Sequence, residues 1–187
     1  MALEQQSVIV LPGYMNSGVG HWQTRWEAQY PGFSRIAMRD WDHPVCEQWC
    51  DTLDTAIASA TGRVLLAAHS LGCLTVAFWA ARVLSDGARE DVLAKVAGAL
   101  LVAVPDPAGP EFPRDATGFE AVPMQTLPFP SIVVASTDDP YGGVPFSQAC
   151  ASAWGSRWES IGPRGHINAD SGLGDWPEGQ RWLASVA

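Results

Sequence analysis

Apolar residues in this sequence gather in short runs, and the stretches between the runs have helical spacing. The runs are Ser7–Leu11, Arg35–Met38, Val64–Ala68, Ala99–Val104, Ile132–Ser136 and Arg157–Ile161. Most are continuous and rich in Val, Ile and Leu, as in strands that a parallel sheet buries on both faces. Helices are expected at residues 21–30, 44–60, 71–85, 145–154 and 177–186. This alternation predicts one α/β domain over residues 1–187, a doubly wound, mostly parallel sheet of about six strands.

The segment Pro105–Pro130 interrupts the alternation of strands and helices. It holds seven of the 14 prolines and shows no helical period. Because proline disfavours helix interiors, we expect an extended loop across the strand ends and no separate lid domain.

Composition and charge narrow the class of protein. Of the 187 residues, 47% are hydrophobic and 17% are charged, which is typical of a folded globular domain. The formal net charge of -9 would repel phosphate backbones, so no nucleic-acid partner is expected. The first apolar run, Val8–Leu11, is too short for a signal peptide or a membrane span, which predicts a cytoplasmic protein without membrane attachment. The four cysteines form no C-x-x-C pair; we expect reduced packing residues and no metal.

The strongest chemical signal is the segment Ala68-His69-Ser70-Leu71-Gly72. It follows an apolar strand-like run and opens an apolar helix. This is the setting of the G-x-S-x-G nucleophile elbow, in which small residues beside the serine let strand and helix approach closely. Ala68 replaces the first glycine of that motif. The pattern predicts that Ser70 is the nucleophile of a hydrolase.

A nucleophilic serine needs a base, and the base needs an orienting acid. His166 lies beyond the elbow on a glycine-bounded loop after the last predicted strand, which makes it the candidate base. Three carboxylates that follow strands could supply the acid. We favour Asp139, because Pro140 restricts it to extended backbone. Asp106 is the second candidate, with an Asx-turn as its alternative role, and Asp138 is expected in a turn or a helix cap.

Backbone amides and nearby side chains complete the predicted site. The N–H groups of Tyr14 and Leu71 are expected to form an oxyanion hole. Asn16, Trp22 and His69 are expected to contact the substrate. The Gly18-Val19-Gly20 segment lacks the third glycine of a dinucleotide-binding motif, so no cofactor is expected.

These residues, with several further blocks, resemble a known family. The blocks are Leu11-Pro12-Gly13-Tyr14, His21-Trp22-Gln23, Ala68-His69-Ser70-Leu71-Gly72-Cys73, Leu127-Pro128-Phe129-Pro130, Asp139-Pro140-Tyr141-Gly142 and Gly165-His166-Ile167-Asn168. They look like those of the small serine hydrolases related to retinoblastoma-binding protein nine, above all the bacterial members described as α/β-hydrolase-family esterases. The resemblance spans essentially the whole chain. It implies a lid-less α/β-hydrolase fold with a triad of Ser70, Asp139 and His166.

One property of the vertebrate namesake is not expected here. Its L-x-C-x-E motif is replaced by Leu71-Gly72-Cys73-Leu74-Thr75, which lacks the glutamate, so binding to the retinoblastoma protein is unsupported. The sequence therefore predicts a serine hydrolase that cleaves small esters through an acyl-enzyme. The alternatives are a serine peptidase or amidase with the same triad, and a non-catalytic protein-binding module on the same fold. The oligomeric state is not predicted.

Overall fold

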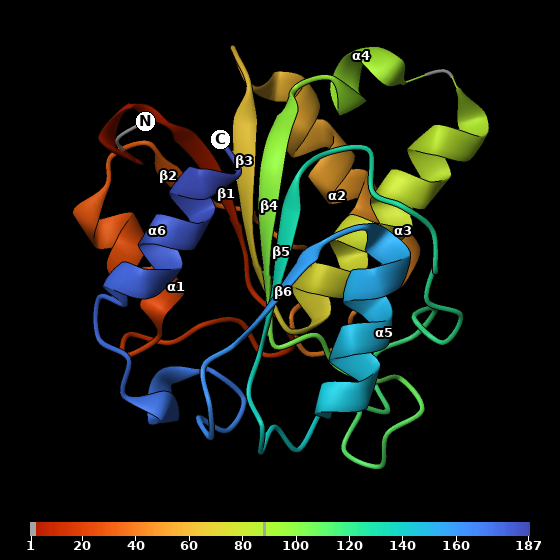
Figure 1. Ribbon diagram of the computed structural model, residues 1–187. Coiled ribbons are helices and arrows are strands. Elements are labelled where there is room, and N and C mark those ends of the chain that lie inside the picture. The colour runs from red at the N-terminus through yellow and green to blue at the C-terminus, as the bar shows by residue number, and fades with distance from the viewer. Residues whose placement is uncertain (1–2, 88) are drawn as a thin grey trace.

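The computed structural model describes residues 3–87 and 89–187 and contains a six-stranded, entirely parallel sheet (Figure 1). The strand order is β2-β1-β3-β4-β5-β6. The strands are β1 (Ser7–Leu11), β2 (Phe33–Arg35), β3 (Val64–His69), β4 (Val96–Val102), β5 (Ser131–Ala135) and β6 (Arg157–Ser160). The three strands β3, β4 and β5 are buried at every position, which explains their continuous apolar runs.

Helices cover both faces of the sheet. On one face lie α1 (Trp22–Gln29) and α6 (Pro177–Ser185); on the other lie α2 (Cys46–Ser59), α3 (Leu71–Asp86) and α5 (Val144–Trp154) (Figure 1). Each face has its own cluster of buried apolar side chains, so the sheet separates two cores. Three short helices complete the fold: η1 (Leu3–Gln5), α4 (Glu90–Leu93) and η2 (Ala169–Ser171).

The predicted α/β architecture is confirmed, with local differences. The fourth strand, expected at Ala99–Val104, lies at Val96–Val102. The second strand was expected at Arg35–Met38 but lies at Phe33–Arg35. Ile36 and Met38 are buried, at 4% and 6% exposure, but they pack beyond the end of the ladder, so their hydrophobicity indicated burial rather than strand. The short helix α4 was not predicted, because one turn leaves no period to detect.

The segment between β4 and β5 forms the expected extended connection, with no separate lid. It contains one isolated bridge, between Val45 and Thr117, and no regular helix or strand among residues 105–130. Phe119 is fully buried, and the indole of Trp154 donates to the Pro123 carbonyl oxygen at 2.8 Å. These contacts hold the segment against the α2–α3 side of the protein.

Within the described part of the chain, no helix combines the length and apolar character needed to cross a membrane. All four cysteines are free thiols in the interior, as expected of packing residues.

Candidate active site

Ser70 occupies the sharp turn between β3 and α3. Its φ and ψ are 53° and −124°, a strained conformation for a residue that carries a side chain. The turn brings α3 so close to β1 that a Cβ on Gly72 would lie 2.4 Å from the carbonyl oxygen of Leu11. Only glycine fits there, which explains the glycine two residues after the serine. The strained turn sets Ser70 at the carboxyl end of β3, where ligands bind in parallel sheets.

The loops after β5 and β6 bring a carboxylate and an imidazole to Ser70. The Nε2 atom of His166 lies 2.8 Å from the Ser70 Oγ atom. The Nδ1 atom of His166 lies 2.9 and 3.0 Å from the two carboxylate oxygens of Asp139. An ionised carboxylate only accepts, so Nδ1 carries the proton and Nε2 is left to accept from the serine hydroxyl. The side chains of His166 and Asp139 are only 11% and 1% exposed, so little water competes for these bonds.

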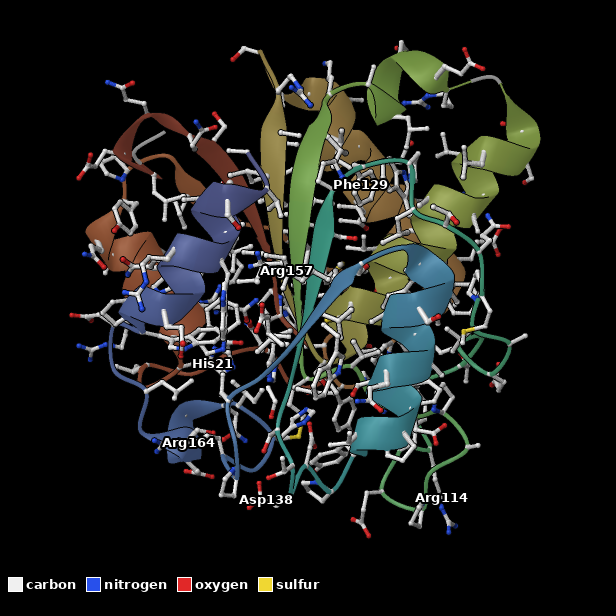
Figure 2. The ribbon with its side chains drawn as sticks, in the orientation of Figure 1. His21, Arg114, Phe129, Asp138, Arg157 and Arg164 are labelled. Carbon is white, nitrogen blue, oxygen red and sulfur yellow. The ribbon has the colours of Figure 1, made fainter. Side chains whose placement is uncertain are left out.

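The other two candidate acids, Asp138 and Asp106, accept hydrogen bonds within loops and do not contact the imidazole. The Asp138 carboxylate accepts from the Ser136 hydroxyl and from the Gly165 amide, both at 2.7 Å, and these bonds lower the pKa of Asp138. It thereby ties the β5 loop to the β6 loop, at the lower end of the sheet in Figure 2. Asp106 accepts from the Ala108 amide at 2.9 Å in an Asx-turn. Of the three carboxylates, only that of Asp139 contacts the imidazole.

Two backbone amides lie beside Ser70. A Cβ on Gly13 would stand 2.7 Å from the Ser70 Cβ atom, so the Gly13–Tyr14 backbone touches the elbow. Among the described residues, the Tyr14 amide has no hydrogen-bond acceptor. Leu71 begins α3, and the amides of a first helical turn have no acceptor within their helix. Both predicted oxyanion donors are thus next to the serine, and neither amide has an acceptor within the described part of the chain.

A cavity of about 190 Å³ opens onto Ser70 and His166. Met15, Pro105, Pro113 and Tyr141 form an apolar part of its wall, and the predicted contact residues Asn16 and His69 also line it. The prediction for Trp22 is wrong for this cavity. Trp22 is 1% exposed, and its indole N–H donates to the Ile167 carbonyl oxygen at 3.0 Å. Trp22 therefore supports the loop that carries His166, through the Ile167 carbonyl, and does not line the cavity.

Sequence reasoning missed a cluster of three histidine rings. The ring of His69 lies between those of His21 and His166, with centroid separations of 4.6 and 4.8 Å. Burial, followed by the neighbouring charges of Arg35 and His166, lowers the pKa of His21 to about 3. The Nδ1 atom of His21 accepts from the Gln23 amide and caps α1. Since histidine is not among the preferred N-cap residues, the sequence carried little signal for this role.

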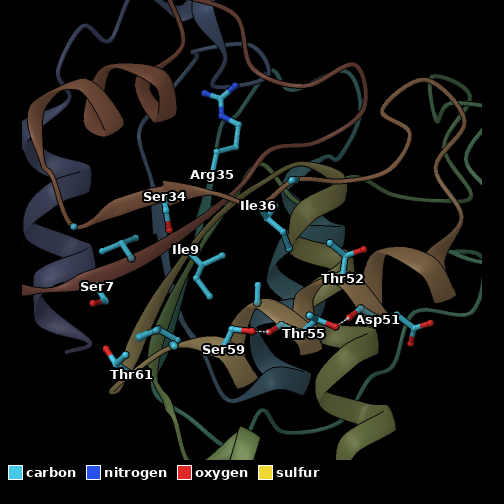
Figure 3. A pocket seen from close by; sticks show the side chains of 16 residues that line it. Ser7, Ile9, Ser34, Arg35, Ile36, Asp51, Thr52, Thr55, Ser59 and Thr61 are labelled. Carbon is cyan, nitrogen blue, oxygen red and sulfur yellow. Dashed lines mark hydrogen bonds between the residues drawn. The ribbon is translucent and has the colours of Figure 1, made fainter.

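A larger groove, of about 720 Å³, lies away from Ser70 between α2 and the first two strands (Figure 3). The hydroxyls of Thr52, Thr55 and Ser59 face it but donate to carbonyl groups of their own helix. This groove brings together no nucleophile and base. Within residues 3–87 and 89–187, no three His, Cys, Asp or Glu side chains gather as a candidate metal site.

Comparison with known proteins assigns the class. The model of the serine hydrolase family matches residues 8–185, nearly the whole chain. The chain therefore belongs to the serine hydrolase family, and it is a hydrolytic enzyme with the α/β-hydrolase fold. The family resemblance inferred from the sequence motifs agrees with this result.

Solved structures refine the comparison. A YdeN-like hydrolase from Pectobacterium atrosepticum is 28% identical, with a TM-score of 0.80 over 98% of this chain and 94% of that chain. The ydeN gene product of B. subtilis is 20% identical, with a TM-score of 0.73 over 97% and 98% of the two chains. A thermophilic esterase from Thermogutta terrifontis shares the fold at 16% identity, with a TM-score of 0.65 over 97% and 90%. The search of curated proteins found no match.

Proposed function

We propose that this serine hydrolase is a carboxylesterase for small esters, with Ser70 as nucleophile, His166 as base and Asp139 as the acid that orients the base. The observation that carries the proposal is the continuous hydrogen-bond chain from the Ser70 hydroxyl through the His166 ring to the Asp139 carboxylate. Its bond lengths, together with the tautomer that a carboxylate acceptor requires, are those that nucleophilic catalysis by serine requires.

The proposed reaction has two halves. The Ser70 oxygen attacks the ester carbonyl while His166 Nε2 takes the hydroxyl proton, and the resulting oxyanion accepts from the amides of Tyr14 and Leu71. His166 then gives the proton to the leaving alcohol, and an acyl-enzyme forms on Ser70. In the second half His166 removes a proton from water, which attacks the acyl carbon. The bond between the acyl carbon and the Ser70 oxygen then breaks, His166 returns its proton to that oxygen, and the acid is released.

The cavity supports a short substrate. The cavity at Ser70 has a volume of about 190 Å³, which suits a short acyl group, and a shallower hollow of about 470 Å³ adjoins it at Tyr141, His166 and Asn168. Pro105 and Pro113 of the cavity rim come from an extended segment without a lid. The proposed partner is therefore a small ester, with its apolar part against Met15 and Tyr141.

Labelling and hydrolysis test the proposal together. A fluorophosphonate probe should label the native enzyme at Ser70, and Ser70→Ala should lose both labelling and hydrolysis of p-nitrophenyl esters. Alanine adds no bulk at the elbow, so the variant should melt at nearly the native temperature. Ser147→Ala is a matched control, because Ser147 is a buried serine outside the cavity. Labelling that persists in Ser70→Ala would refute the nucleophile, and faster cleavage of matched amides than of esters would replace the esterase by an amidase.

A further inference from the structure

His69, the residue before Ser70, is turned toward the loop that carries His166. Only 5% of its surface is exposed, and its Nε2 atom lies 2.8 Å from the backbone carbonyl oxygen of His166. A carbonyl oxygen only accepts hydrogen bonds, so the proton of His69 must be on Nε2. The contact is therefore a donor bond from a fixed tautomer to the main chain of His166.

The loop that carries His166 depends on such side-chain contacts. Gly165 and Ile167, on either side of His166, have positive φ values of 57° and 49°, so the loop is irregular and lies outside the sheet. Three successive residues are held by three side chains from other elements. The Asp138 carboxylate accepts from the Gly165 amide, His69 donates to the His166 carbonyl, and Trp22 donates to the Ile167 carbonyl. Of these three contacts, that of His69 acts on His166 itself.

The bond has to be made without adding a charge. The rings of His69 and His166 are 4.8 Å apart, and a cationic His69 would oppose the imidazolium that forms on His166 during acyl transfer. Burial, followed by the charges of His21 and His166, holds the pKa of His69 well below its ordinary value. His21 packs edge-on against His69 and is neutral for similar reasons. A neutral imidazole thus supplies a donor that Lys or Arg could supply only with a positive charge.

We propose that His69 is a positioning residue, which holds the backbone of His166 so that the imidazole stays aligned with Ser70. This replaces the role of substrate contact that the sequence suggested for His69. The inference rests on the proposed function, since it takes His166 to be the base. Displacing a reacting group by about 1 Å can cost about 100-fold in rate, which sets the size of the expected effect.

Two amide variants of equal polarity separate the donor bond from simple packing. In His69→Gln the side-chain nitrogen reaches about as far as Nε2 and can still donate to the His166 carbonyl. In His69→Asn the amide is one methylene shorter and cannot reach it. We expect kcat to fall about 100-fold in His69→Asn, with KM within about threefold of the native value, and to recover to within about tenfold of native in His69→Gln.

Different results would overturn the positioning role of His69 and the proposed function. Native kcat in His69→Asn, or equal losses in the two variants, would overturn the positioning role. A rise in KM at unchanged kcat would make His69 a substrate contact instead. Activity in Ser70→Ala or His166→Ala would overturn the proposed function, and the positioning role would fall with it; the two His69 variants bear on the positioning role alone.

A measurement on the native protein covers the case in which the variants fail to fold. Imidazole ¹⁵N NMR from pH 5 to 8 should show His69 neutral and protonated on Nε2 throughout, whether or not the protein hydrolyses esters. A His69 signal that titrates within this range, or that carries its proton on Nδ1, would overturn the inference.

Discussion

Replacing Asp139 by asparagine is the sharpest test of how the imidazole is oriented. In the native site Asp139 Oδ1 accepts from the Tyr141 amide at 2.9 Å as well as from His166 Nδ1, so this oxygen is fixed by the backbone. An asparagine that keeps its oxygen on the Tyr141 amide places its NH₂ group where Oδ2 stood, 3.0 Å from Nδ1. An NH₂ group cannot accept from Nδ1–H. The oxygen that remains, 2.9 Å from Nδ1, could accept that proton only with the NH₂ donor facing it as well, whereas an unprotonated Nδ1 accepts from the NH₂ group. The imidazole therefore gains by moving its proton to Nε2.

The rearranged tautomer is inactive, because Nε2–H cannot take a proton from Ser70. Only 1% of the Asp139 side chain is exposed, so water cannot take over the role of the lost oxygen. In a serine protease the same replacement of the triad acid lowers kcat about 10⁴-fold. We expect a loss of that order, which corresponds to about 5 kcal/mol of transition-state stabilisation at 1.36 kcal/mol for each factor of ten.

The assay compares kcat for p-nitrophenyl acetate in three asparagine variants, with thermal unfolding as the check of folding. Asp138→Asn and Asp106→Asn are matched controls, because each makes the same chemical change at a strand end without touching the imidazole. Both should stay within about tenfold of native. A folded Asp139→Asn enzyme with more than about a tenth of native kcat would refute the reasoning. If Asp106→Asn were the inactive variant, the acid would come from the end of β4.

Three further outcomes are expected. Gly72→Ala should lower the free energy of unfolding by about 1–3 kcal/mol, because its Cβ would meet the Leu11 carbonyl oxygen. Gly62→Ala is the control and should leave the free energy of unfolding unchanged, because the space around Gly62 is open. Equal urea unfolding midpoints for the two variants would contradict this expectation. The pKa of Asp138 is lowered by folding, so its charge stabilises the fold above the ordinary carboxyl pKa of about 3.8 and stops doing so as the pH falls through its lower folded pKa. The melting temperature of native enzyme should accordingly exceed that of Asp138→Asn at pH 7, and a gap that does not narrow toward pH 3 would contradict this account. The rate of ester hydrolysis should fall as the acyl chain lengthens, and it should not rise abruptly when the substrate forms a lipid emulsion. Such interfacial activation would indicate a mobile cover over the cavity.

Features of the site that depend on local chain geometry could be predicted from the sequence. The elbow at Ser70 needs a buried strand, a tight turn and a small residue at position 72, and each requirement restricts the residue types at those positions. His166 could be chosen because it follows the last strand. These requirements act between near neighbours in the chain, so residue type and spacing report them.

Contacts across the fold could not be predicted in the same way. Trp22 precedes Ile167 by 145 residues, and nothing in either segment indicates that the indole supports that carbonyl. The bond from His69 to the His166 backbone could not be predicted either, because every residue has a backbone carbonyl and residue type does not indicate which one accepts. Residues predicted as substrate contacts from their position near strand ends can therefore hold a loop instead.

The choice among the carboxylates could not be made from strand order. Asp106 and Asp139 both follow buried strands, and their spacing along the chain does not say which strand lies beside the one that leads to His166. The observed order β3-β4-β5-β6 makes β5 the neighbour of β6 and leaves β4 one strand farther away. The His166 imidazole, however, reaches back to Ser70 at the end of β3, and β4 is the neighbour of β3, so strand order leaves a side chain after β4 within reach. The local chain makes the choice: the Asp106 carboxylate accepts from the Ala108 amide in an Asx-turn, whereas the Asp139 carboxylate, which Pro140 favoured through its backbone restriction, contacts the imidazole.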